Sequence, residues 1–258
     1  MSTPIIKLSG VIITYNEERN IENCITSLIN VVDEIVVVDS YSTDKTKAIC
    51  KRFNVKFIEQ KFLGYIEQKN FTLAQASYDY VVSLDGDESL SEQLQESLLE
   101  LKSDWKFDGY YCNRLNNFCG QWIRHSDWYP NRKLRVFDRR KAKWTGINPH
   151  DHVKLNDESS KTGHINGDIL HKTYQSYSEF NLKTEYFSTI AAKAYFDKGK
   201  KAPILKIIWN PFWAFFKAYF LRLGFLDGFN GYIICKQTAN ITFLKYSKLR
   251  ELHKKSSE

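Results

Sequence analysis

Three carboxylates within four residues are the first candidates for chemistry in this chain. Asp85, Asp87 and Glu88 lie in the stretch SLDGDES, directly after the apolar segment 80–82. Like charges this close repel one another unless a cation joins them. Magnesium and manganese prefer one or two carboxylates together with phosphate oxygens. The cluster therefore suits a divalent cation that carries a phosphorylated ligand.

Other interpretations of the cluster are possible. An EF-hand would need Gly where Leu90 stands and a helix before the loop, so we reject calcium sensing. A phosphohydrolase of the haloacid dehalogenase kind would use Asp85 as its nucleophile, although such enzymes normally have Thr or Val at the position of Glu88. Asp87 and Glu88 could also simply favour the positive N-terminus of a following helix. The last two alternatives stay open at this point.

The elements before and around the cluster alternate between strands and helices. We expect strands at 10–14, 34–39, 55–58 and 80–84, and helices at 21–32, 44–53, 65–76 and 89–101. The last helix is predicted to open with the capping box Ser89-x-x-Glu92. This alternation predicts an α/β fold with a mainly parallel sheet and helices on both faces.

The carboxyl ends of parallel strands form the ligand-binding rim of such sheets. Five polar residues should therefore lie on one rim, namely Asn16, Glu17, Asp39, Asp85 and Asp87. A divalent cation with a nucleotide phosphate would relieve the repulsion among their carboxylates. This convergence is the strongest physical argument for a functional site.

The second half of the chain changes character. Strands are predicted at 108–118 and 133–137, separated by a polar, aromatic loop, and the chain looks helical from residue 177 onward. No repeat, low-complexity segment or Pro/Gly linker marks a boundary. We expect a catalytic domain over residues 1–200 and a helical, aromatic-rich extension over 201–258.

Composition and charge narrow the function class. The chain has 258 residues, 43% of them hydrophobic, and a net charge of +7 that suits an anionic partner. A nucleic-acid-binding protein is disfavoured because the densest aromatic segment is poor in charge. Five scattered cysteines without a CxxC pair indicate thiols in a reducing compartment, and we see no signal-peptide pattern. A cytoplasmic location follows.

An ordered set of motifs resembles a known enzyme family. The stretches VIITYNEERNI, EIVVVDSYSTDKT, QKN and LDGDE are similar to those of the inverting glycosyltransferases of family 2, which have the GT-A fold. The stretches YPNRKLRVF, NPHDHV, ILHKTYQS and LGFLDGFNGY extend the match. The full run resembles the lipopolysaccharide-core β-glucosyltransferase subgroup and covers nearly the entire chain.

The resemblance implies a nucleotide site in the first half. Thr14, Asn16 and Glu17 would line the nucleotide pocket, and Asp39 would accept a hydrogen bond from the base, usually uracil. Asp39 could instead cap a turn near Ser42.

The remaining first-half roles concern phosphate and metal. Lys69 would lie near the base or phosphates, although it could be a solvated helix-face lysine. Asp85 would hold the ribose or a metal-bound water. Asp87 would coordinate Mg²⁺ or Mn²⁺ bridging the diphosphate.

The resemblance also implies roles in the second half. Asp151 is the candidate general base, where the resembling subgroup has Glu; its alternative is a loop carboxylate paired to a basic neighbour. His171 would meet the metal or diphosphate, or would be a core histidine. Arg132 and Arg135 are predicted to project from one face of a strand toward the diphosphate, or from a solvated face.

The implied activity is one displacement that inverts the anomeric carbon, with a nucleotide sugar such as UDP-glucose as donor and a saccharide or glycolipid as acceptor.

The segment 207–221 has only Lys217 as a charge and is interrupted by Pro211, and it is too short to span a bilayer. Its aromatic residues predict a helix in the membrane interface, at the inner face of the cytoplasmic membrane. The same residues could cover the catalytic domain or a subunit interface.

Overall fold

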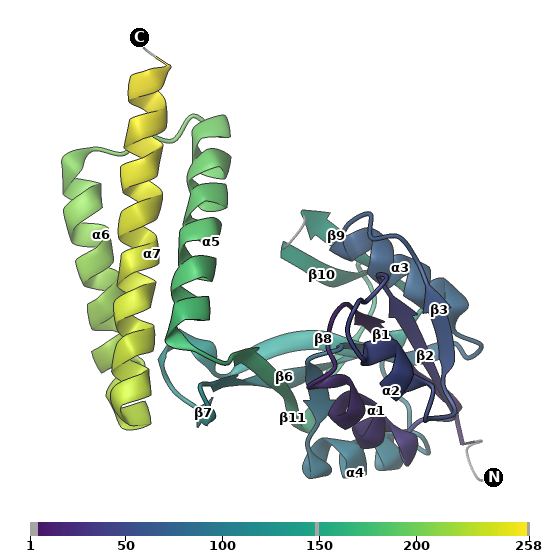
Figure 1. Cartoon of the computed structure of the whole chain (residues 1–258). Helices are drawn as coiled ribbons and strands as arrows, with labels where there is room; N and C mark the ends of the chain where they lie inside the picture. Colours follow the sequence, from purple (N-terminus) through teal and green to yellow (C-terminus); the bar gives the residue numbers. More distant parts are fainter. Residues whose placement is uncertain (1–4, 148–149, 257–258) are drawn as a thin grey trace. The chain divides into compact units, whose positions relative to one another are not determined.

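The computed structural model describes residues 5–147 and 150–256, and they form two compact units (Figure 1). The first unit comprises Met1–Arg114 and Asn131–Lys172, and the second comprises Leu115–Pro130 and Thr173–Glu258. This division differs from the predicted boundary at residue 200, because the segment 173–200 belongs to the second unit by its contacts.

The first unit begins with four parallel strands in the order β3-β2-β1-β4. These strands are β1 (Leu8–Thr14), β2 (Glu34–Asp39), β3 (Lys56–Glu59) and β4 (Tyr80–Asp85). The helices between them are α1 (Ile21–Ile29), α2 (Thr46–Cys50) and α3 (Tyr65–Gln75). All seven residues of β1 are buried, which explains why this strand reads as a nearly continuous apolar run.

Beyond β4 the sheet continues with β8, β6, β11 and β5, and the pairs β4–β8, β8–β6 and β11–β5 are antiparallel. The bounds are β5 (Glu88–Leu90), β6 (Gly109–Phe118), β8 (Asn131–Asp138) and β11 (Thr162–Tyr174), with β7 (Gln121–Ile123) paired to β6. A separate two-stranded sheet contains β9 (Ala142–Ile147) and β10 (His150–Leu155). The predicted α/β class is confirmed, with the parallel part confined to the first four strands.

Helices cover both faces of the parallel strands, as predicted. Ile12 packs in a core with Ile25 of α1 and Leu94 of α4 (Glu92–Leu101). The adjacent Val11 packs in a second core with Leu73 of α3 and Trp144 of β9. Successive side chains of β1 thus point to opposite layers, which is the two-residue period of a strand.

The predicted start of α4 was wrong. Ser91, not Ser89, is the N-cap, and its hydroxyl accepts a hydrogen bond from Leu94 N at 3.2 Å. Ser89 instead lies in β5, opposite Leu170 of β11. Because β5 holds residues 88–90 in an extended conformation, the helix begins only after them.

The second unit is helical, as predicted from residue 177 onward. It contains α5 (Tyr177–Asp197), α6 (Ile204–Phe216) and α7 (Gly228–Lys255), and α7 lies between the other two (Figure 1). Short helical turns occupy Ser126–Trp128, Lys217–Leu221 and Gly224–Asp227. Among the described residues no helix has the length and apolar character needed to cross a bilayer.

All five cysteines of the chain are free thiols.

Candidate active site

The ends of β1 and β4 meet at Gly86. Gly86 N donates a hydrogen bond to Ile13 O at 2.9 Å. A Cβ at this position would lie 2.7 Å from Thr14 Oγ1 and 3.2 Å from Glu17 Cγ. Only glycine fits this approach, so the DGD sequence lets the two strand ends share one rim, as predicted.

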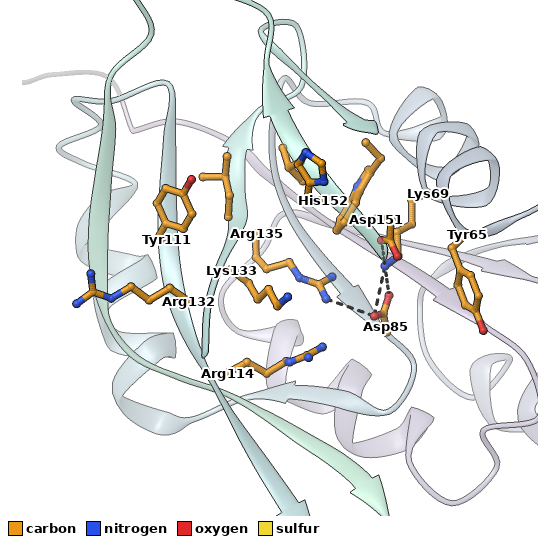
Figure 2. A pocket seen from close by; sticks show the side chains of 13 residues that line it. Tyr65, Lys69, Asp85, Tyr111, Arg114, Arg132, Lys133, Arg135, Asp151 and His152 are labelled. Carbon is orange, nitrogen blue, oxygen red and sulfur yellow. Dashed lines mark hydrogen bonds and ion pairs between the residues drawn. The ribbon is translucent and has the colours of Figure 1, made fainter. Parts of the chain in front are cut away.

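Lys69 of α3 joins two carboxylates from distant parts of the chain (Figure 2). Its Nζ lies 3.0 Å from Asp85 Oδ1 and 2.7 Å from Asp151 Oδ2, and its side chain is 4% exposed. The alternative of a solvated lysine was therefore wrong. Asp151 lies in strand β10 rather than in a loop, and its pairing with a basic residue matches the alternative noted for it.

The ring of Trp144 contacts two cations of the site, Lys69 and Arg135. Lys69 Nζ lies 4.2 Å and the Arg135 guanidinium carbon 5.1 Å from the centroid of its ring. The neighbouring Asn70 exchanges two hydrogen bonds with the Trp144 backbone, at 2.9 and 3.0 Å. The QKN stretch of α3 thus fixes the indole on which Lys69 and Arg135 rest.

Glu88 is fully buried and anchors two arginines. Its Oε1 lies 3.1 Å from Arg135 Nη2 and 3.3 Å from Arg114 Nη1, and its Oε2 accepts a hydrogen bond from Asp85 N at 3.0 Å. Arg135 also contacts Asp85, with Nη2 3.3 Å from Oδ2. Buried charges require such partners, so Glu88 holds these guanidinium groups in place. The sequence had left its purpose open.

The electrostatics of the cluster favour the charged form of Asp85 and disfavour that of Lys133. Burial works to raise the pKa of Asp85, but the positive charges of Lys69 and Arg135 outweigh it and hold that pKa well below the usual range. Burial, reinforced by Arg114 and Arg135, lowers the pKa of Lys133. Asp85 is therefore held as a carboxylate at the end of β4.

A cavity of about 590 Å³ opens beside this network. Asp85 and Asp151 line it together with Tyr65, Tyr111 and Trp144. Its cationic lining residues outnumber these two carboxylates: they are Lys69, Arg114, Arg132, Lys133 and Arg135. A cavity with this charge balance suits an anionic ligand that accepts several hydrogen bonds, such as a diphosphate.

Arg132 and Arg135 reach this cavity in different ways. Residues three apart lie on opposite faces of a regular strand, so the predicted common face required an irregularity. The strand has one: Tyr110 pairs with Val136 and Tyr111 with Leu134, which leaves Arg135 as an extra residue in β8. Arg135 is buried among carboxylates, whereas Arg132 is exposed and points away from them (Figure 2).

The lining of the cavity does not include Thr14, Asn16, Glu17 or Asp39, which were predicted for the nucleotide pocket. Asp39 is fully buried, and its two oxygens accept hydrogen bonds from Ser42 Oγ at 2.5 Å and Ser42 N at 2.7 Å. These contacts match the capping alternative. Asn16 N donates to Ser42 Oγ at 2.8 Å, and Asn16 Oδ1 accepts from Thr43 N at 2.8 Å. The loops after β1 and β2 are thereby tied together.

The structure brings the two predicted metal ligands together. His171 Nε2 lies 3.2 Å from Asp87 Oδ2. Across residues 5–147 and 150–256, no group of three or more His, Cys, Asp or Glu side chains is arranged to hold a metal ion. Two protein donors fit Mg²⁺ or Mn²⁺ only if phosphate oxygens and water complete the coordination, which is the donor set these ions commonly use with nucleotides.

Five contributors to the site were missed in the sequence: Asn70, Glu88, Arg114, Lys133 and Trp144. Glu88 and Leu90 are both buried in β5, so a two-residue period was available as a signal for Glu88. No local pattern marks Arg114 or Trp144, because their roles depend on how β6 and β9 pack against the rim.

An α/β unit with a cationic cavity beside the acidic end of β4 has the architecture of an enzyme that handles nucleotide diphosphates. A sequence profile described as glycosyl transferase family 2 matches residues 9–158. The chain is 33% identical over 258 residues to an uncharacterized glycosyltransferase of Rickettsia bellii, which covers 95% of this chain and 87% of that protein. It therefore belongs to glycosyltransferase family 2, as the ordered motifs predicted.

A further relative carries a more specific name. The lipopolysaccharide core biosynthesis glycosyltransferase LpsC of Rhizobium meliloti is 31% identical over 262 residues, which covers 97% of this chain and 94% of that protein. Among solved structures, S. aureus TarS 1-349 in complex with UDP aligns over 97% of this chain and 92% of its own at 14% identity, with a TM-score of 0.44. This score is low, so the assignment rests on the sequence relatives.

Proposed function

We propose that this family 2 enzyme is an inverting transferase that moves glucose from UDP-glucose onto a saccharide or glycolipid of the lipopolysaccharide core. The relative LpsC supports the class of acceptor, and the motif resemblance supports the donor and the inversion. One observation carries the proposal: Lys69 bridges Asp85 at the end of β4 and Asp151 of β10 inside a cationic cavity.

In this proposal the cations of β6 and β8 bind the donor diphosphate. Arg114 and Arg135 are pre-oriented by Glu88, and Lys133 and the exposed Arg132 stand at the same cavity. Guanidinium groups stay charged and bind phosphate oxygens through paired donors. Thr14, Asn16, Glu17 and Asp39 would line the base and ribose side, with Asp85 toward the ribose.

Asp151 is the proposed general base. Its side chain is 10% exposed and faces the cavity, where it can take the proton of the acceptor hydroxyl as that oxygen attacks the anomeric carbon. Lys69 holds Asp151 in position, and because Lys69 also binds Asp85, it links the position of the base to the donor site. One displacement from the opposite face inverts the configuration.

Asp87 and His171 are the proposed metal ligands. They would hold Mg²⁺ or Mn²⁺, which when bound neutralises charge that develops on the departing diphosphate. A lipid-linked acceptor further implies that the enzyme works in the cytoplasm at the inner face of the cytoplasmic membrane.

The test is a transfer assay with a panel of labelled nucleotide sugars, with Mg²⁺ or Mn²⁺ and lipopolysaccharide-core acceptors. We expect UDP-glucose to be used and Asp87→Ala to lower the metal-dependent rate at least about 100-fold while the protein stays folded. Asp157→Ala is the matched control, because Asp157 is an exposed carboxylate in the turn after β10 and accepts its hydrogen bonds from Ser159. Retained activity in Asp87→Ala would remove Asp87 from the metal site, and a phosphoryl group trapped on Asp85 would support the phosphohydrolase instead.

A further inference from the structure

Helix α6 buries none of its 13 residues. Its large apolar side chains form what we call the α6 face: Ile204, Leu205, Ile208, Trp209, Phe212 and Trp213. They are between 54% and 67% exposed. A continuous exposed apolar surface of this kind marks an interaction site.

The α6 face is a single stripe along the helix. Ile204, Ile208 and Phe212 recur every four residues, and the residue after each of them belongs to the stripe as well. Side chains four apart lie above one another on a helix. The partly buried residues Ile207, Asn210 and Ala214 lie on the other side of α6, which packs on α7. The apolar stripe therefore faces away from the unit's own core.

Positive charge surrounds this stripe. Residues 198–226 contain six cations and no Asp or Glu: Lys198, Lys200, Lys201, Lys206, Lys217 and Arg222. Asp127 lies 3.4 Å from Lys217 and 3.5 Å from Arg222 and partly neutralises these two. The other four lysines are exposed at the N-terminal end of α6 or just before it. A surface that is both apolar and anionic would complement the apolar stripe and the lysines beside it.

We propose that the α6 face docks on a membrane surface that contains anionic lipids, with the helix axis in the plane of the interface. Tryptophan and phenylalanine on one side and lysine at the edge are the composition of helices that lie at the lipid headgroups. At about 1.5 Å per residue, α6 is about 20 Å long, shorter than the hydrocarbon core. The proposal deepens the proposed function, since it names the surface that would meet a lipid-borne acceptor.

The test is flotation of the full chain with vesicles of phosphatidylcholine, alone or mixed with phosphatidylglycerol. We expect binding to the anionic vesicles that weakens as salt is added. The double substitution W209E/W213E should lower this binding at least about 100-fold, because it removes two aromatic side chains that docking would bury in the membrane and adds negative charge. Leu182→Glu is the matched control: Leu182 is 74% exposed on α5, outside the α6 face, and its substitution should leave binding unchanged.

A second variant separates charge from apolar burial. K201Q/K206Q should weaken binding to anionic vesicles roughly 30-fold, at about fivefold per lysine, with no change on phosphatidylcholine alone. Circular dichroism and thermal melting check that each variant is folded. Equal binding of W209E/W213E and the wild type would overturn the proposal.

Another outcome would also overturn it. If the wild type ignores vesicles but self-associates in sedimentation experiments, and W209E/W213E does not, the α6 face is an interface between copies of this chain. Transfer to a water-soluble acceptor fragment, measured in the same variants without vesicles, reports on the proposed function separately. The two assays can thus show loss of membrane docking with transferase activity retained, or loss of transferase activity with membrane docking retained.

Discussion

Lys69 in the first unit is a charged side chain with 4% exposure, whereas Trp213 in the second unit is an indole with 54% exposure. Each is the reverse of the usual distribution of residues between interior and surface. Lys69 is buried between its partners Asp85 and Asp151, and Trp213 is exposed because α6 packs on α7 through its opposite side. Such departures from the usual pattern mark the two surfaces where the protein should meet other molecules.

The largest effect is expected at Asp151, on the buried, charged side of this comparison. Asp151→Ala should lower the rate of transfer by about 10²- to 10⁴-fold, the usual contribution of a general base. Steady-state kinetics should show the loss in kcat, with a modest change in KM. A loss of less than tenfold would mean that Asp151 only pairs with Lys69.

The anchoring role of Glu88 predicts a large loss of stability. Glu88→Ala leaves two guanidinium groups without their buried partner and should destabilise the fold by about 3–5 kcal/mol in urea denaturation. Glu59→Ala is the matched control, since its ion pair with Lys47 is at the surface and should contribute less than about 1 kcal/mol. Equal losses would show that burial does not distinguish these ion pairs.

Acid should weaken the same network. The pKa of Asp85 is lowered in the folded state by Lys69 and Arg135, so at acidic pH the unfolded chain binds the extra proton first. Its stabilisation is complete above the ordinary Asp pKa of about 3.9 and disappears as the pH falls through the folded value. The stability advantage of the wild type over Asp85→Asn should therefore shrink by about 1–2 kcal/mol toward pH 3. A constant difference between the two proteins from neutral to acidic pH would contradict this expectation.

The smallest effect is expected on the exposed side of the comparison. Trp213→Ala should change the free energy of unfolding by no more than about 0.5 kcal/mol, because the indole packs little within its unit. Trp144→Ala, the buried counterpart that supports Lys69 and Arg135, should cost about 3–5 kcal/mol. Thermal and urea denaturation of both variants make the comparison, and a large loss in Trp213→Ala would mean that α6 needs this side chain to fold.

The sequence by itself determined the parallel strands, the meeting of Glu17 and Asp85 at one rim, and the helical C-terminal region. These follow from local periodicity and from the rule that parallel strands end at one edge, which need no knowledge of distant contacts. The segments 142–147 and 150–155 were different: they form β9 and β10, and local periodicity predicted neither strand.

Only the tertiary structure decided which charges meet. Lys69 and Asp151 are 82 positions apart, and their ion pair exists because β9, the partner strand of β10, packs on α3. The extra residue in β8 buries Arg135, and β5 moves the helix cap from Ser89 to Ser91. Strand register and helix docking set these contacts through the packing of many residues at once, and the local pattern of side chains does not encode them one by one.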